Sequence, residues 1–94
     1  MTLEAVEESG SLRSRRADLI CREVDGRLVG LDLTSSHYFS LNPSGTLLWR
    51  LLEGGAKASQ LVDALVAEHD VDRDTAAADV AVFVESLHEQ SLLE

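Results

Sequence analysis

The stretch HYFSLNPSGTLLWR, residues 37–50, predicts a strand that runs directly into a helix. Its first five residues are rich in β-forming side chains, and successive residues such as Tyr38 and Phe39 point to opposite faces of a strand. Asn42 then supplies a strong N-cap, and Pro43 fits the first helical position because its missing N–H is not needed there. The chain is therefore expected to change from sheet to helix at Asn42.

Two more strands are expected upstream of this junction. The apolar segments at residues 19–24 and 27–33 are separated only by Asp25-Gly26. An Asp-Gly pair between apolar runs favours a two-residue type I′ hairpin, because both central residues need positive φ. A polar turn at residues 34–36 then leads to the third strand. Period-two spacing places three apolar residues of the second strand on one face: Val29, Leu31 and Leu33.

Three helices are expected downstream. The first ends at Gly54-Gly55, since glycine favours the left-handed conformation that terminates helices. Ser59 is expected to cap the second helix, and Asp72 or Asp74 the third, which runs to about Gln90. The apolar stripes, at three- and four-residue spacing, are Leu47, Leu48, Leu51 and Leu52, then Leu61, Val62, Leu65 and Val66, then Ala76, Val80, Phe83, Val84 and Leu87.

The predicted fold is therefore α+β, with a three-stranded antiparallel sheet followed by three helices on one of its faces. This order resembles a winged helix-turn-helix. Residues 17–94 are expected to form one domain, with Leu92-Leu93 folded back on the core. Residues 1–16 mix Glu, Ser, Gly and Arg without a sustained period, and a flexible N-terminal tail is expected there.

The charge of the chain narrows its partners. The net charge is −9, and residues 53–94 hold ten acidic residues against two basic ones. Such a surface repels phosphate backbones and anionic lipid heads, so neither nucleic acid nor a membrane is an expected partner. Cys21 is the only cysteine, which fits a reducing compartment. With no signal peptide and no apolar stretch of membrane-spanning length, a cytoplasmic protein is expected.

The sequence offers no catalytic or metal-binding constellation. The three histidines, His37, His69 and His88, lack Cys or acidic neighbours at the spacing of metal ligands. Gly54-Gly55 is not followed by the Gly-Lys-Ser/Thr of a phosphate loop. A core this small leaves little room for a deep pocket that would perturb carboxylate pKa values. A non-catalytic protein without a cofactor is expected.

Two other binding classes are disfavoured. An acyl carrier needs a modifiable serine at a helix start, and the nearest match, Glu85-Ser86-Leu87, falls in the middle of the third predicted helix. A DNA-binding winged helix needs basic or amide side chains on its recognition helix. Residues 72–89 instead hold one arginine against five acidic residues.

The order of these features resembles a known family. Residues 38–49, YFSLNPSGTLLW, are similar to the strand-to-helix signature of PqqD-like proteins: a short aromatic strand, Leu-Asn, a small-residue turn with Gly, and an apolar–Trp pair. Val71-Asp72, residues 79–87 (DVAVFVESL) and the final Leu92-Leu93-Glu94 are similar to the third helix and close of that family. The resemblance extends over about residues 18–94.

The resemblance implies a function. PqqD-like domains bind the leader part of ribosomally made precursor peptides and present the core to modifying or proteolytic enzymes. The leader adds as a strand beside the third strand and lies against the third helix. A free-standing copy resembles the recognition proteins of lasso peptide pathways, which work with a separate leader protease, and the chaperone of pyrroloquinoline quinone synthesis. The pathway class, lasso peptide or quinone cofactor, stays open at this point.

The physical argument agrees with that role, because the third strand of a meander is an edge with unpaired N–H and C=O groups. The candidate peptide-binding residues are His37, Tyr38, Phe39 and Ser40 on this strand, with Asp79, Val80, Val82, Phe83 and Ser86 on the third helix. Phe39, Val80 and Phe83 are equally consistent with core positions, whereas Tyr38 and Val82 point away from the main apolar stripes. The alternative hypothesis is a generic protein–protein adaptor or a winged-helix regulatory domain.

Overall fold

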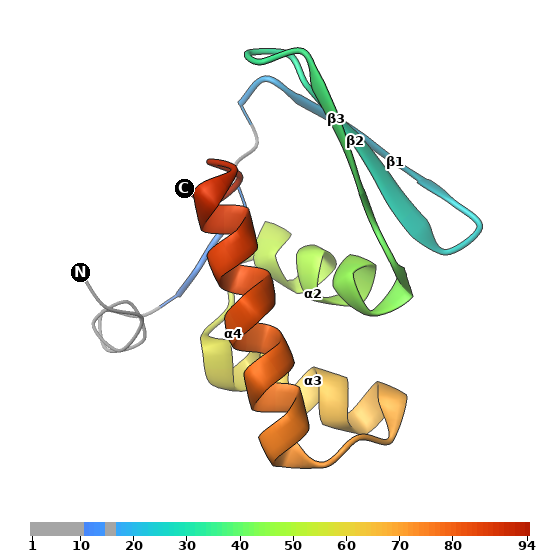
Figure 1. The fold of residues 1–94 in the computed structure, drawn as a ribbon, viewed down its shortest axis with the longest axis vertical. Helices are drawn as coiled ribbons and strands as arrows, with labels where there is room; N and C mark the ends of the chain where they lie inside the picture. The colour runs from blue at the N-terminus through green and yellow to red at the C-terminus, as the bar shows by residue number, and fades with distance from the viewer. Residues whose placement is uncertain (1–10, 15–16) are drawn as a thin grey trace.

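The computed structural model describes residues 11–14 and 17–94, which form a small sheet and three helices (Figure 1). The elements are β1 (Leu19–Val24), β2 (Arg27–Asp32), β3 (His37–Leu41), α2 (Pro43–Glu53), α3 (Ala58–His69) and α4 (Arg73–Glu89). The three strands form an antiparallel sheet in the order β1-β2-β3. The prediction of an α+β fold with the sheet first is confirmed.

The first hairpin has the expected turn. Asp25 and Gly26 adopt φ values of 52° and 79°, which is the conformation that a type I′ turn requires at both central residues. This turn fixes the register of the sheet, so Cys21 lies opposite Gly30, and Gly30 lies opposite Phe39. These three residues share one face of the sheet, since residues directly opposite each other in an antiparallel pair lie on the same side.

The junction between β3 and α2 is held by two side chains. Asn42 caps α2 by accepting a hydrogen bond from the Gly45 N–H at 2.8 Å. The buried Thr46 hydroxyl accepts from the Leu28 N–H at 2.8 Å and donates to the Leu41 carbonyl at 3.3 Å. Thr46 therefore closes the last rung between β2 and β3 and ties α2 to the end of the sheet.

The helix boundaries follow most of the sequence signals. Gly55, with φ of 86°, ends the first helical segment as expected. The prediction of Ser59 as the cap of the next helix is wrong, because α3 begins at Ala58 and its N-cap is Lys57, whose N–H donates to the Gln60 side chain at 2.8 Å. Asp72 caps α4 by accepting from the Thr75 N–H at 3.0 Å. Hydrogen bonding with Thr75 lowers the pKa of Asp72.

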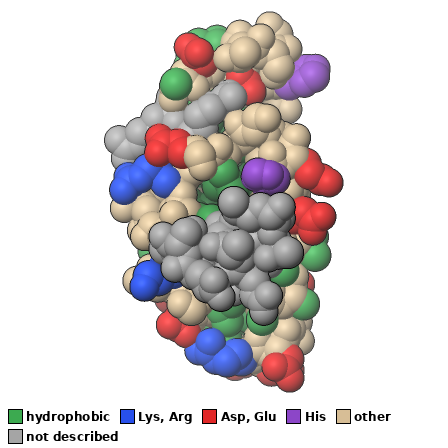
Figure 2. All heavy atoms as spheres, turned by 90° about the vertical axis from the view of Figure 1, so that its left-hand side faces the viewer, with side chains coloured by type: hydrophobic (Ala, Val, Ile, Leu, Met, Phe, Trp, Pro, Cys, Tyr) green, Lys and Arg blue, Asp and Glu red, His purple; other side chains and the backbone are tan. Residues whose placement is uncertain are grey.

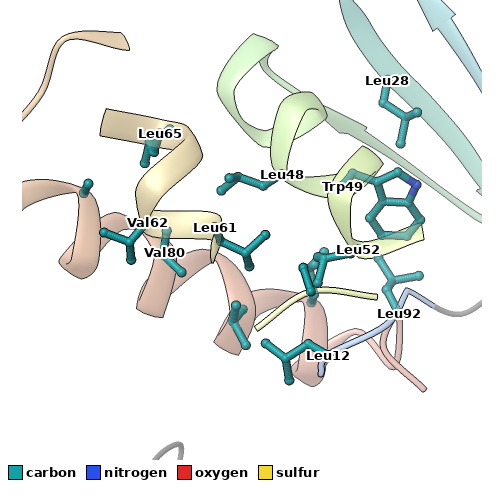
Figure 3. Packing of buried hydrophobic residues seen from close by; sticks show 14 residues of the cluster. Leu12, Leu28, Leu48, Trp49, Leu52, Leu61, Val62, Leu65, Val80 and Leu92 are labelled. Carbon is teal, nitrogen blue, oxygen red and sulfur yellow. The ribbon is translucent and has the colours of Figure 1, made fainter. Parts of the chain in front are cut away.

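The core lies around α2, which packs on the sheet on one side and on α3 on the other (Figure 1). Trp49 is 1% exposed, and its ring centroid lies 5.7 Å from that of Phe39. Leu28 of β2 points toward the same indole, while Leu61 of α3 lies on the far side of α2 (Figure 3). The helices therefore do not cover the sheet equally: α2 packs on it directly, α3 packs against α2, and α4 packs mainly against α3.

In β2, the face that packs against the helices is not the face on which period-two spacing grouped the apolar side chains. Leu28 and Gly30 are buried against the helices, while Val29 and Leu31 lie on the other face of the sheet. Gly30 explains this orientation, because a Cβ there would lie 2.3 Å from the ring of Phe39. The aromatic ring therefore lies directly over the Gly30 backbone.

Part of the N-terminal segment belongs to the folded domain. Leu12 is buried and exchanges backbone hydrogen bonds of 2.7 and 2.8 Å with Ala56. Ser14 donates to the Leu52 carbonyl at 3.0 Å, and Arg13 accepts from the Glu94 N–H at 2.8 Å. Residues 11–14 thus join the linker after α2 to the chain end, where Leu92 is buried as expected. The remainder of the predicted tail, residues 1–10 and 15–16, lies outside the described residues.

Candidate functional site

The outer edge of β3 is open within the described part of the chain, since β3 pairs there with β2 alone. The backbone groups of an edge strand alternate between the neighbouring strand and solvent. The Leu28 N–H points toward β3, because it reaches the Thr46 hydroxyl beside Leu41. Leu41 and Phe39, which lie opposite Leu28 and Gly30, therefore direct their backbone groups toward β2. Tyr38 and Ser40, which alternate with them, direct their N–H and C=O groups to the open edge.

Two hollows lie at the two ends of β3. The first, of about 730 Å³, is bounded by the start of α2 and by α4, and is called the helix hollow. The second, of about 530 Å³, lies between the start of β3 and the end of α4, and is called the strand hollow. A five-residue strand is about 17 Å long. An added strand of similar length would therefore reach from one hollow to the other.

The helix hollow has an apolar wall and a polar rim. Its apolar side chains include Val82 and Phe83 of α4 together with Leu48 and Leu65 from the other two helices. Phe83 approaches the first turn of α2 so closely that a Cβ on Gly45 would lie 3.3 Å from its ring. The polar lining residues are Asn42, Ser44, His69, Asp79 and Ser86.

The strand hollow is more polar. Its lining includes His37, Tyr38 and Phe39 of β3, and Glu89 and Gln90 at the end of α4; the others are Asp32, Thr34, Ser35, Ser91 and Leu92. Phe39 contributes only part of its surface here, because its ring packs against Trp49 over Gly30. Tyr38 is 75% exposed and belongs by register to the opposite face of the sheet.

The structure divides the nine predicted site residues into three groups. Asp79, Val82, Phe83 and Ser86 line the helix hollow, and His37, Tyr38 and Phe39 line the strand hollow. Ser40 lines neither hollow but lies on the open edge of β3. Val80 is buried in the core at 2% exposed and does not face either hollow.

Several lining residues were not among the predicted ones. In the helix hollow these include Leu65, His69 and Val71, which come from the end of α3 and the loop after it. In the strand hollow they include Glu89 and Gln90. In the sequence, His69 was noted only as an isolated histidine, and tertiary packing brings the end of α3 beside α2 and α4.

Within residues 11–14 and 17–94, no group of three or more His, Cys, Asp or Glu side chains is placed to hold a metal ion. Burial, more than the nearby Glu53 carboxylate, raises the pKa of the Cys21 thiol, which opposes formation of a reactive thiolate. No helix in the described part of the chain is long and apolar enough to cross a membrane.

Electrostatics near the hollows is mixed. Asp79 and His69 line the helix hollow, and Glu89 and His37 line the strand hollow. Figure 2 shows acidic, basic and hydrophobic side chains interspersed on the side of the molecule that lies at the left in Figure 1. The helix α4 itself holds one arginine and four acidic residues, so it lacks the positive surface that a recognition helix presents to DNA.

The chain matches the model of a known protein family over most of its described length. Residues 27–93 match the family model of coenzyme PQQ synthesis protein D (PqqD), and the chain belongs to this family. The resemblance noted from the sequence is thereby confirmed.

Two solved structures resemble the chain over most of its length. The first, TbiB1 in complex with the TbiA(beta) leader peptide, is 34% identical with a TM-score of 0.79, and the match covers 87% of this chain and 94% of that one. The second, lasso peptide synthetase B1 complexed with the leader peptide, is 29% identical with a TM-score of 0.77, covering 88% and 96%. No curated protein sequence matches the chain.

Proposed function

We propose that this chain binds the leader segment of a ribosomal precursor peptide by β-strand addition and delivers it to a modifying or proteolytic enzyme. The pathway is of the lasso peptide type, the setting is the cytoplasm, and the chain itself catalyses no reaction. The observation that carries the proposal is the likeness of this chain to two solved complexes with leader peptides. The open edge of β3, with one hollow at each end, supports it.

The open edge by itself supports only modest affinity. Tyr38 and Ser40 offer outward backbone groups, and each hydrogen bond to them is worth roughly 0.5–1.5 kcal/mol net. Ordering a flexible leader costs roughly 2–5 kcal/mol. Side chains of the leader that enter the hollows must therefore supply much of the binding free energy. Val82, which is 69% exposed in the free chain, lines the helix hollow and offers apolar surface to such a side chain.

The experiment that tests strand addition is an N-methyl scan of the cognate leader. Each leader amide is methylated in turn, and binding to the chain is measured by fluorescence polarisation. Only alternate amides of an added strand bond to β3, so methylation is expected to weaken binding at every second position across a short segment. The unmethylated leader and methylation outside that segment are the controls.

Two results would contradict the proposal. If the cognate leader does not bind at micromolar concentration, leader recognition is excluded. If it binds but the scan has no period of two, the leader does not add to β3. A labelled DNA duplex in the same assay tests the winged-helix alternative, for which the acidic α4 predicts no binding.

A further inference from the structure

The face of the sheet that points away from the helices carries an apolar surface outside the proposed leader site. Ile20 lies opposite Leu31, which lies opposite Tyr38, and Arg22 lies opposite Val29. Because directly opposed residues share a side of the sheet, these positions form one continuous surface. The outer sheet face is defined here as Ile20, Arg22, Val24, Arg27, Val29 and Leu31.

This surface is open to solvent. Ile20 is 58% exposed and Val24 is 49% exposed. Leu33, which follows β2 on the same alternation, is exposed as well. Contiguous exposed apolar side chains on a small protein mark a contact surface for another molecule. The contact lies mainly on β1 and β2, whereas the leader would add along the outer edge of β3.

The charges on the outer sheet face are all of one sign. Arg22 and Arg27 are its only charged ladder positions, and neither forms an ion pair with another described residue. Arg50, by contrast, is paired with Glu23 on the opposite face of β1. In a chain of net charge −9, this face is an apolar surface with positive charge. It complements an apolar surface that carries carboxylates.

Charge also argues against a second copy of the chain as the occupant. A symmetric contact would place this face against itself, so the arginines of both copies would meet without any carboxylate from the ladder positions. The leader is not the occupant either, because strand addition extends the sheet in its own plane beyond β3. The outer sheet face stays open while the leader is bound.

We propose that the outer sheet face docks the enzyme that processes the bound leader, through an apolar, carboxylate-bearing surface of that enzyme. The proposal rests on the proposed function. Outward side chains of an added leader strand would continue this face beside Tyr38, so the docked enzyme would contact the chain and the leader together. The chain thereby holds both components at once.

The test uses the full chain, its cognate leader and the enzyme that processes that leader. The face variants are Ile20→Glu and Arg22→Glu, and the matched controls are Leu51→Glu and Lys57→Glu, which lie outside the face. Leader affinity is measured first by fluorescence polarisation, and it also reports folding. Affinity of the leader-loaded chain for the immobilised enzyme is then measured by biolayer interferometry.

The expected result is at least tenfold weaker enzyme binding for both face variants, with leader affinity within twofold of the wild type, and unchanged enzyme binding for the controls. Wild-type enzyme affinity in the face variants, or no enzyme binding by the wild type, would overturn the docking proposal. Loss of a wild-type dimer in Ile20→Glu during sedimentation would also overturn it, in favour of a second copy. Failure of the wild type to bind the leader would instead overturn the proposed function.

Discussion

Val80 and Val82 form a matched pair that separates folding from peptide binding. They are the same residue type on the same helix, α4, but Val80 is 2% exposed in the core and Val82 is 69% exposed beside the helix hollow. Truncation to alanine removes the same two methyl groups at both positions. The two truncations are therefore expected to differ only through their surroundings.

The stability cost follows from the burial of each side chain. Each buried methylene-sized group is worth about 0.8 kcal/mol, and a residual cavity adds to this, so Val80→Ala should cost roughly 2–3 kcal/mol. A change of that size lowers the Tm of a domain this small by at least about 8 °C. Val82→Ala removes mostly exposed groups and should cost about 0.5 kcal/mol, a shift within about 4 °C.

Leader affinity, in contrast to stability, should depend on Val82. Val82→Lys places a charge where an apolar leader side chain must be desolvated, which is unfavourable on binding. The new ammonium lies three residues after Asp79, a spacing that supports a helix rather than disrupting it. The expected result is a nearly unchanged circular dichroism melt and at least tenfold weaker leader binding, about 1.4 kcal/mol.

Two outcomes would refute this reasoning. If Val82→Lys melts as low as Val80→Ala, then Val82 supports the core and its exposure in the free chain is misleading. If Val82→Lys both melts and binds as the wild type does, the leader does not use the helix hollow. Fluorescence polarisation with the cognate leader and thermal melts on the same samples distinguish these outcomes.

Three further predictions concern the junction, pH and catalysis. Thr46→Val leaves the buried Leu28 N–H and Leu41 carbonyl without their hydroxyl partner and should cost about 1–3 kcal/mol in urea unfolding; an unchanged midpoint would contradict this role. Asp72 has a lowered pKa in the folded chain, so its contribution to stability is present above its ordinary pKa of about 3.9 and is lost as the pH falls through the lower folded value. The difference in unfolding free energy between the wild type and Asp72→Asn should therefore shrink as the pH falls through that window. A difference that does not change with pH would argue against this role of Asp72. Precursor peptide incubated with the purified chain alone should keep its mass in mass spectrometry, and a mass change that persists through repurification would reveal an activity.

Local signals in the sequence were sufficient for the order of the elements. Asp25-Gly26 determined the first hairpin because both residues accept positive φ, as the observed values of 52° and 79° confirm. Asn42 and Pro43 set the start of α2, and Asp72 set the start of α4. These features depend on interactions within a few residues, so they can be predicted without knowledge of the tertiary packing.

The sequence was less informative about the residue at which α3 begins. Ser59 is a better capping residue than Lys57, yet α3 begins at Ala58. The buried Ala58 and Leu61 fix the helix against its neighbours, so burial decides the boundary rather than the side chain of the cap.

The face that each strand and helix presents was decided by tertiary structure. Period-two spacing grouped Val29 and Leu31 correctly, but it carried no information on which side the helices would cover. Phe39 decided this, because its ring packs on Trp49 and only Gly30 leaves room beneath it. The same limit applies to α4, where Val80 and Phe83 belong to the same apolar stripe of the sequence. Only the position of α2 and α3 determines that one is core and the other borders a hollow, because burial is a property of several elements packed together and not of any one of them.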